Sequence, residues 1–249
     1  MEAFIAGTVS SSITNWPGKT CFLVLFAGCD FKCPYCSSSE YIEQKEEFKV
    51  NLKDIKKEIK ENKDFVDAVV FSGAEPCLQR AALVYLAEHC RELKLKTGLE
   101  TNGSNPNVIK ILIERGLLDF IALDLKSPWD IQFFEKVTNS KTFFRTADEV
   151  LEKIRGSLNL LKEKKGILNI EIRTTIVPGL IYRKEDVLDI AKEVNEVGCR
   201  WRLQGFRSNL GGVLSQKFRN VNPPTKEFLQ NLKQACRKEH PNLRIEVEL

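Results

Sequence analysis

Hydrophobic positions fall into two kinds of segment that alternate along the chain. Short continuous apolar runs, such as residues 21–26, are typical of strands that are buried on both faces. Apolar residues that recur every three or four positions indicate helices, as in the segment after Asn51, which is a candidate N-cap. Strand followed by helix recurs about six times. This order predicts an α/β fold with a parallel sheet and right-handed crossovers.

The expected elements can be given as residue ranges. Strands are predicted at 21–26, 68–71, about 96–100, 120–123, 168–177 and 200–206, with a last edge strand at 244–248. Helices are predicted after Asn51, at about 80–94, before Gly116, from Val150 to Leu161, from Val187 to Val194, and at about 225–238. The remaining segments are an irregular lead-in at 4–19, a long connection at 127–145 and a polar loop at 207–224.

Polar segments directly follow nearly every predicted strand. They occupy residues 28–36, 72–76, 100–103, 124–126, 178–179 and 204–207. In a barrel all such strand ends meet at one rim, whereas in an open sheet only those at a switch point converge. The pattern therefore favours a partial (β/α)6 barrel of the TIM type, with parallel strands and an active site at the C-terminal rim.

Length and composition add limits to this picture. The 249 residues lack a Ser/Gly/Pro-rich linker, which predicts a single domain over 1–249, with its core at about 20–207 and a C-terminal helix and edge strand at about 225–249. A net charge of +4 neither indicates nor excludes nucleic acid. No apolar run reaches the ~18–20 residues of a membrane span, and the first residues do not resemble a secretory signal. We expect a cytoplasmic protein without a membrane partner.

Three of the eight cysteines form a compact motif, C-x3-C-x2-C, at Cys29, Cys33 and Cys36. Disulfides are not expected in a chain without an export signal, so clustered thiols point to a metal. Structural zinc and most iron–sulfur clusters take four ligands, so three thiols imply either a distant fourth ligand or an open metal position. No histidine follows nearby, which favours iron–sulfur over zinc. Cys21, Cys90, Cys199 and Cys236 are expected to be small core residues. Cys77, which directly follows Pro76, could be a hydrogen donor or a buried residue, and burial is the favoured interpretation.

The cysteine motif, with Tyr35 before its last cysteine, resembles the signature of the radical S-adenosylmethionine (SAM) superfamily. Residues 72–76 resemble the Gly-Gly-Glu-Pro turn of that family, and 100–103 and 124–126 resemble segments of its pyruvate formate-lyase activating branch. The similarity is greatest to anaerobic ribonucleoside-triphosphate reductase activating proteins. It covers roughly residues 5–207 and is carried by residues 16–19, 72–76, 101–106, 173–175 and 203–207.

The resemblance implies a [4Fe–4S] cluster on Cys29, Cys33 and Cys36, with SAM on the fourth iron. The cofactor-binding residues that it implies are Tyr35, Gly73, Ala74, Glu75, Thr101, Asp124, Lys126, Arg173 and Gln204. Glu75 and the 72–76 backbone would accept hydrogen bonds from the SAM ammonium, Lys126 would pair with the SAM carboxylate, and Tyr35 would pack beside the adenine. Glu100, Thr101 and Asp124 would hold a monovalent cation. Glu100, Asp124 and Arg173 could instead form ordinary ion pairs, and Tyr35 could be a core aromatic residue.

The chain departs from the family pattern at three places. Ala74 replaces the second glycine of the turn, and alanine does not easily adopt a positive φ. Residues 37–39 are three serines where the family often has His-Asn-Pro, on the side of the cluster that faces the substrate. Asn15 replaces an aspartate. The serines affect the assignment of a substrate more than the radical chemistry.

We therefore expect a radical SAM oxidoreductase that cleaves SAM reductively to a 5′-deoxyadenosyl radical. Its expected target is a glycine of an anaerobic ribonucleotide reductase, and its electron donor would be a ferredoxin or flavodoxin. The alternatives are a radical SAM enzyme that acts on a small molecule, a nucleotide or an RNA base, and a non-enzymatic zinc or electron-transfer protein. The matched turns at the other strand ends argue against the last class.

Overall fold

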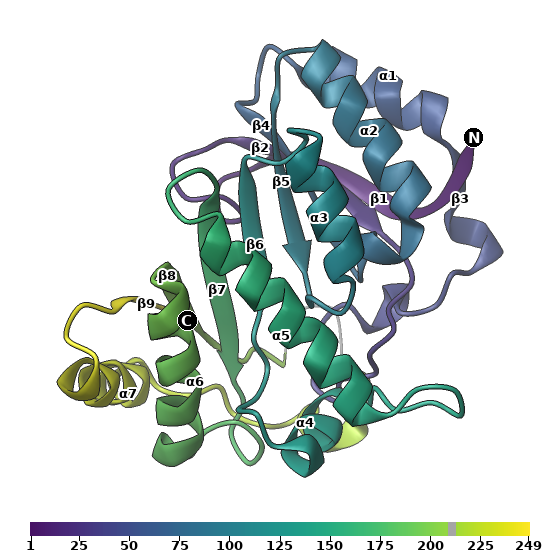
Figure 1. Cartoon of the computed structure of the whole chain (residues 1–249). Coiled ribbons are helices and arrows are strands. Elements are labelled where there is room, and N and C mark those ends of the chain that lie inside the picture. Colours follow the sequence, from purple (N-terminus) through teal and green to yellow (C-terminus); the bar gives the residue numbers. More distant parts are fainter. Residues whose placement is uncertain (209–212) are drawn as a thin grey trace. The chain divides into compact units, whose positions relative to one another are not determined.

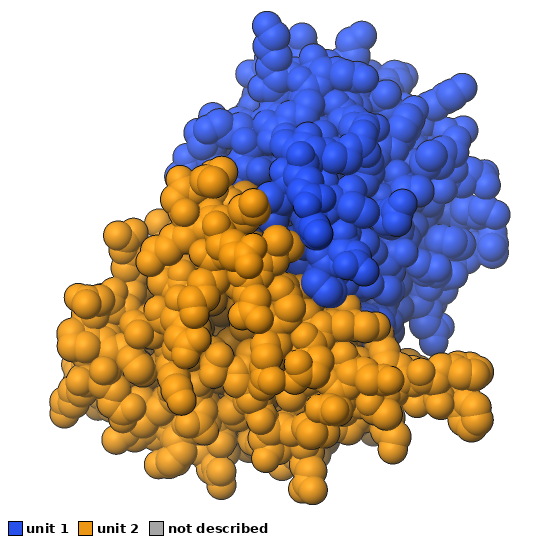
Figure 2. Space-filling model, in the orientation of Figure 1, with its two compact units in different colours: residues 1–30, 40–101, 105–122 blue, residues 31–39, 102–104, 123–249 orange. Residues whose placement is uncertain are grey.

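The computed structural model describes residues 1–208 and 213–249. These residues form two compact units, which Figure 2 shows in blue and orange. Unit 1 consists of residues 1–30, 40–101 and 105–122, and unit 2 consists of residues 31–39, 102–104 and 123–249. Residues 209–212 of the predicted polar loop lie outside the described part of the chain.

Unit 1 is built on a sheet in which the strand order is β3-β1-β2-β4-β5-β6 (Figure 1). β2, β4 and β5 pair in parallel, whereas β1 is antiparallel to both β2 and β3. The strands are β1 (Glu2–Ser12), β2 (Cys21–Phe26), β3 (Lys49–Asn51), β4 (Ala68–Gly73), β5 (Lys96–Thr101) and β6 (Phe120–Asp124), of which the last two residues of β6 belong to unit 2. The apolar runs that predicted β2, β4 and β6 are buried, which confirms that the sheet is covered on both faces there.

The three helices that the sequence predicts in unit 1 are present, although the second ends at Glu92 and not at residue 94. They are α1 (Leu52–Asn62), α2 (Arg80–Glu92) and α3 (Pro106–Glu114). Asn51 is the N-cap of α1, because its side-chain oxygen accepts a hydrogen bond from the Lys53 N–H at 3.0 Å. Gly116 has a φ of +62° just after α3 ends, which explains why the helix stops there.

The prediction of an irregular lead-in at residues 4–19 is wrong for its first part. β1 occupies Glu2–Ser12 and pairs with β2 along much of its length. Most of its residues are either small or polar, so the alternation of apolar side chains that would predict a strand is weak. The strand is stabilised by its pairing with β2, and the local sequence pattern does not predict this pairing.

The second part of the lead-in is fixed by an aromatic contact. Trp16 is buried and stacks on Phe120 of β6, with ring centroids 4.8 Å apart and an interplanar angle of 15°. Both residues belong to the same hydrophobic cluster as Leu23 and Val70. The turn at Pro17 and Gly18, which the sequence predicts, therefore begins directly after a core residue.

Unit 2 contains the strand order β7-β8-β9, and its strands pair in parallel. They are β7 (Asn169–Ile176), β8 (Arg200–Gly205) and β9 (Arg244–Glu248), the last of which confirms the predicted edge strand. Leu125, just after β6, donates its N–H to the Arg173 carbonyl at 2.9 Å and so ties this segment to β7. The helices are α4 (Ile131–Thr138), α5 (Ala147–Glu163), α6 (Lys184–Val197) and α7 (Lys226–Glu239).

α4 is an element that the sequence analysis does not predict, since it lies in the segment read as a long connection. The helix has only eight residues, and Phe134 and Val137 are its buried apolar positions. Asp130 caps it by accepting a hydrogen bond from the Phe133 N–H at 2.6 Å. So short an apolar stripe does not stand out against the surrounding sequence.

The main prediction of the fold is confirmed. The chain alternates between strands and helices, and most of its paired strands are parallel. Among the described residues, no helix is both long enough and apolar enough to cross a membrane.

Candidate active site

The turn after β4 is held to the end of β2 by backbone hydrogen bonds. The N–H of Ala74 donates to the Phe26 carbonyl at 2.8 Å, and the N–H of Glu75 donates to the Gly28 carbonyl at 2.9 Å. Gly73 has a φ of +99°, and a Cβ atom there would lie 2.5 Å from the Phe26 oxygen. Only glycine fits this position. The φ of Ala74 is not positive, so the replacement of the second glycine of the family turn causes no strain.

Glu75 is completely buried, and its carboxylate joins the turn to β5. Oε1 accepts a hydrogen bond from the Cys77 N–H at 2.9 Å and another from the Thr101 hydroxyl at 2.8 Å. The first of these bonds caps the 3-10 helix η3 (Pro76–Gln79). Glu75 and Thr101, two of the predicted cofactor-binding residues, are therefore in direct contact.

Cys77 lies within this group and is buried, as the sequence predicts. Its Sγ is 3.7 Å from the Thr101 hydroxyl. Burial, reinforced by the nearby negative charge of Glu75, raises the pKa of the Cys77 thiol well above its usual value. A thiol held in the neutral form is a poor nucleophile and a poor metal ligand.

Glu100 collects hydrogen bonds from neutral donors in unit 1. The Asn15 side-chain amide donates to Oε1 at 2.9 Å, and the Ser72 hydroxyl donates to Oε2. Asn15 is itself oriented by Ser12, whose hydroxyl donates to Asn15 Oδ1 at 2.6 Å. The residue that replaces the family aspartate thus acts as a donor to Glu100, a role that an ionised aspartate could not take.

The cysteine motif is divided between the two units: Cys29 belongs to unit 1, and Cys33 and Cys36 belong to unit 2. In unit 1, Gly28 and Cys29 donate their N–H groups to Tyr41 and Ile42 at 2.7 and 2.9 Å. Within the described ranges 1–208 and 213–249, Cys, His, Asp and Glu side chains form no ready group of three metal ligands. Ligation by all three thiols therefore stays a prediction from their spacing.

In unit 2, Cys33 and Cys36 are joined by one tight turn. The Cys36 N–H donates to the Cys33 carbonyl at 3.0 Å. Burial raises the pKa of Cys33 to about 12 and also raises that of Cys36, while the Lys126 ammonium acts in the opposite direction on both. Both thiols would have to release their protons to bind iron, and the nearby cation lowers the cost of that release. The donor set of this turn therefore fits an iron–sulfur centre.

Lys126 and Asp124 form an ion pair at the end of β6, with Nζ 2.7 Å from Oδ2. Burial tends to lower the pKa of Lys126, but Asp124, Tyr35 and Cys33 outweigh it and hold the pKa well above its usual value. Lys126 is thus a permanent cation beside the cysteine turn. The sequence leaves open whether Asp124 forms an ordinary ion pair. The structure shows that it does, and that Lys126 is its partner.

Tyr35 is buried between the two cysteines of the same turn. Its ring packs edge-on against Phe206, with centroids 6.4 Å apart. Among the residues that the structure describes, its hydroxyl has no hydrogen-bond partner, although it is buried. Burial raises the pKa of this hydroxyl, which stays protonated. A buried donor without a partner is uncommon in proteins and is consistent with a polar ligand nearby.

Arg173 and Gln204 lie on β7 and β8. The register pairs Arg173 with Arg202 and Thr175 with Gln204, so these side chains share one face of the strands. Arg173 Nε donates to Glu171 Oε1 at 2.6 Å, and Arg202 donates to Glu171 Oε2 at 3.1 Å. The ion pair with a carboxylate that the sequence leaves open for Arg173 is therefore present.

Several residues of these networks are absent from the sequence predictions. Glu171 and Arg202 are buried charges inside the sheet, and Ser72 and Asn15 orient Glu100. Glu171 and Arg202 could have been predicted, because charged residues at alternate positions of an otherwise apolar strand indicate an inward-facing polar cluster. No local signal connects Asn15 to Glu100, which is 85 residues away.

Comparison with known proteins identifies a family and several relatives. The pattern of the Radical SAM superfamily matches residues 23–194. The chain is 31% identical over 248 residues to the protein named "Putative glycyl-radical enzyme activating enzyme" of Methanocaldococcus jannaschii, an alignment that covers 98% of this chain and 96% of that protein.

Two further relatives differ in their named activities. The pyruvate formate-lyase-activating enzyme of Clostridium pasteurianum is 24% identical over 193 residues, 76% of this chain and 74% of its own length. The 7-carboxy-7-deazaguanine synthase of M. jannaschii is 27% identical over 195 residues, 73% of this chain and 72% of its own length.

Among solved structures, a radical SAM methyltransferase from Sphaerobacter thermophilus has a TM-score of 0.68 at 12% identity, over 93% of this chain and 67% of that one. This likeness concerns the fold alone. It agrees with the α/β topology of the parallel strands and confirms the predicted partial barrel.

Proposed function

Because the chain belongs to the radical SAM superfamily, we propose that it is an activating enzyme that installs a glycyl radical on a partner protein, an anaerobic ribonucleotide reductase. The observation that carries this proposal is the 31% identity to a protein named as an activating enzyme, over 98% of the chain. The same family uses a [4Fe–4S] cluster and SAM. When these are bound, the cluster supplies one electron to the SAM sulfonium, and methionine and a 5′-deoxyadenosyl radical result.

The residues proposed to hold the cluster are Cys29, Cys33 and Cys36. Three thiolates would leave one of the irons of such a cluster available to SAM. Lys126, which lies beside Cys33 and Cys36, offsets part of the negative charge that three thiolates bring. Its charge is also of the right sign to attract the SAM carboxylate.

The remaining candidate residues divide into two groups by chemistry. Glu75 and the backbone of Gly73 and Ala74 would accept hydrogen bonds from the SAM ammonium, and Tyr35 would border the adenine. Arg173 and Gln204 would line the cofactor or substrate from β7 and β8. The oxygen atoms of Glu100, Thr101 and Asp124 are the proposed ligands of a monovalent cation.

The substrate group in this proposal is a backbone glycine. The 5′-deoxyadenosyl radical would take one hydrogen atom from the glycine Cα, which leaves 5′-deoxyadenosine and a carbon-centred glycyl radical. A ferredoxin or flavodoxin would supply the electron, and the reducing cytoplasm is the proposed location, because thiols remain available to iron there.

Electron paramagnetic resonance tests this function directly. Protein reconstituted with iron and sulfide under anaerobic conditions is mixed with dithionite, SAM and the anaerobic ribonucleotide reductase of the same genome. We expect a glycyl radical doublet with the wild type and none with Cys33→Ala. If the wild type produces 5′-deoxyadenosine but never the doublet, the proposed target is wrong while the radical chemistry stands.

A second candidate is a radical SAM enzyme that acts on a small molecule or nucleotide. The 27% identity to a 7-carboxy-7-deazaguanine synthase supports it, and so do the three serines at 37–39 in place of His-Asn-Pro. This candidate predicts that a low-molecular-weight cell fraction, and not the reductase, stimulates the formation of 5′-deoxyadenosine. The comparison of the two additions, made with the same reconstituted sample, separates the candidates.

A further inference from the structure

The connection between α4 and α5, residues 139–146, exposes two neighbouring phenylalanines. Phe143 is 95% exposed and Phe144 is 91% exposed, and their rings contact each other edge to face at 5.0 Å. The connection projects from the two helices and forms a protrusion of unit 2 (Figures 1 and 2). Two large apolar side chains in water are costly, so their exposure indicates a binding role.

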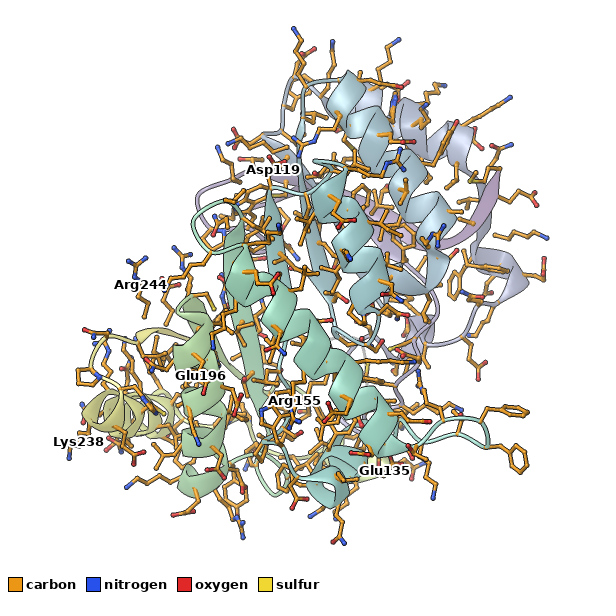
Figure 3. The ribbon with its side chains drawn as sticks, in the orientation of Figure 1. Asp119, Glu135, Arg155, Glu196, Lys238 and Arg244 are labelled. Carbon is orange, nitrogen blue, oxygen red and sulfur yellow. The ribbon has the colours of Figure 1, made fainter. Side chains whose placement is uncertain are left out.

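The connection is held in shape by hydrogen bonds at its base. Glu135, which Figure 3 labels, accepts hydrogen bonds at its Oε2 from the Ser140 N–H at 3.2 Å and the Lys141 N–H at 3.0 Å. Across the turn, the Thr142 N–H donates to the Arg145 carbonyl at 2.9 Å. The two rings therefore lie on a turn that is already ordered by hydrogen bonds. Binding of a partner would not have to pay the entropic cost of ordering this backbone.

The same helix supports the cysteine turn. The Lys32 N–H donates to the carbonyl of Thr138, the last residue of α4, at 2.9 Å. The Phe31 ring packs edge-on against Phe134 of α4, with centroids 5.9 Å apart. The exposed pair thus projects from the element that contacts the chain directly before Cys33. A partner bound at the pair would lie on the same unit as Cys33, Cys36 and Lys126.

Charge around the pair favours one kind of partner. Lys136 and Lys141 are exposed, and Arg145 donates to the Ser140 carbonyl at 3.1 Å. Of the flanking carboxylates, Glu135 and Glu149 accept hydrogen bonds from backbone N–H groups of the connection. An apolar pocket with an acidic rim would complement both the rings and these cations. A small substrate would have no use for such a surface, whereas a protein substrate must be held while its glycine reacts.

We propose that Phe143 and Phe144 form an aromatic anchor that inserts into an acidic-rimmed apolar pocket of the protein substrate and docks it beside the cysteine turn. This inference rests on the proposed function, and it names the surface by which the reductase is recognised. A membrane surface is the less favoured occupant, because stable attachment to a bilayer needs more apolar area than two rings provide.

The test compares the double variant Phe143→Ser/Phe144→Ser with the wild type and with Phe65→Ser. Phe65 is 78% exposed in unit 1 and serves as the matched control for the loss of a surface phenylalanine. Three quantities are measured on reconstituted protein: the Kd for the reductase by biolayer interferometry, the yield of glycyl radical, and the formation of 5′-deoxyadenosine without the reductase.

We expect the double variant to bind the reductase on the order of 30-fold more weakly, as for the loss of an interface hot spot. Its radical yield should fall at low concentration and recover at high concentration, while its cleavage of SAM without the reductase stays at the wild-type level. Phe65→Ser should match the wild type in all three measurements. Because the substituted side chains are exposed, the double variant should also unfold at the wild-type urea concentration.

Three results would overturn the anchor. The first is a double variant that binds and activates the reductase as the wild type does, which leaves the proposed function intact. The second is wild-type binding to anionic lipid vesicles, or self-association in sedimentation velocity, that the double variant loses. The third is a wild type that neither binds the reductase nor forms the glycyl radical, which removes the proposed function together with the anchor.

Discussion

Gly73 is the residue of the turn after β4 that is least able to carry a side chain. Its φ of +99° and the 2.5 Å approach of a hypothetical Cβ to the Phe26 oxygen combine two independent penalties. Ala74, the neighbouring departure from the family pattern, carries neither. The two adjacent positions therefore give a matched pair for testing the turn.

We predict that Gly73→Ala lowers the free energy of unfolding by at least about 2 kcal/mol, because the left-handed backbone alone costs a side chain about 1–2 kcal/mol. Ala74→Gly should cost no more than about 1 kcal/mol, through chain entropy. Urea unfolding followed by circular dichroism measures both. Equal effects at the two positions would show that the turn does not depend on the conformation of Gly73.

The hydrogen bond from Asn15 to Glu100 makes a second prediction at the residue scale. Asn15→Asp places two carboxylates within contact distance, since the present donor and acceptor are 2.9 Å apart. At pH 8 both would be charged, and their repulsion should destabilise the fold by about 1 kcal/mol in this partly exposed setting. The repulsion needs both carboxylates to be charged, so the deficit should disappear as the pH falls toward about 4–5, where carboxyl groups take up protons.

Urea unfolding at pH 8 and pH 5 measures this effect, in a buffer whose only cation is tetramethylammonium so that no small cation can bridge the carboxylates. Asn15→Ala is the control: it removes the hydrogen bond and should show the same deficit at both pH values. An Asn15→Asp protein that is as stable as the wild type at pH 8 would contradict the account of Glu100.

At the scale of elements, the strands of unit 2 are joined by charges as well as by backbone. Glu171 of β7 is 1% exposed and contacts Arg173 and Arg202, while Arg202 also reaches Glu248 of β9 at 2.9 Å. The Glu171 carboxylate thus contacts two buried guanidinium groups at once. Its removal weakens the pairing of both cations, although Arg202 keeps Glu248.

Glu171→Gln should therefore cost about 3–5 kcal/mol, which corresponds to a fall in Tm of roughly 6–20 °C for a chain of this size. Glu246→Gln is the matched control, since Glu246 is 54% exposed and pairs with Arg200 at 3.5 Å. Its loss should cost less than about 1 kcal/mol. Scanning calorimetry distinguishes the two, and a Glu171→Gln protein that melts with the control would refute the role given to this carboxylate.

The elements that the sequence predicts correctly are those whose burial is uniform or strongly periodic. β2 and β4 follow from continuous apolar runs, and α1 follows from its stripe and its Asn51 cap. β1 and α4 are missed because their stability comes from contacts that are distant in sequence: pairing with β2 in one case, and packing of Phe134 on Phe31 in the other. The local sequence of a short element, or of one made of small residues, does not predict such contacts.

At the scale of the whole molecule, the cysteine motif and the turns after the strands identify the family correctly, and the family match over residues 23–194 confirms it. The partners of the site residues within each unit are less predictable. Lys126 pairs with Asp124, two residues away, and Arg173 pairs with Glu171, also two residues away. The sequence permits these pairs but cannot choose them over a ligand, because both outcomes satisfy the same charges.

The identity of the substrate decides which reaction the whole molecule catalyses. Relatives of similar identity are named for a protein target and for a small-molecule product, so family membership alone does not choose between them. The exposed pair Phe143 and Phe144 is the surface feature that favours a protein target. A measurement that follows the abstracted hydrogen atom decides between the two without reference to any relative.

That measurement uses reductase in which glycine is deuterated at Cα, incubated under reducing anaerobic conditions with SAM and the reconstituted protein. Mass spectrometry of the released 5′-deoxyadenosine reads where its new hydrogen came from. We expect 5′-deoxyadenosine that carries one deuterium, in an amount that follows the glycyl radical formed. If the 5′-deoxyadenosine remains free of deuterium, this protein does not take a hydrogen atom from a glycine of its partner.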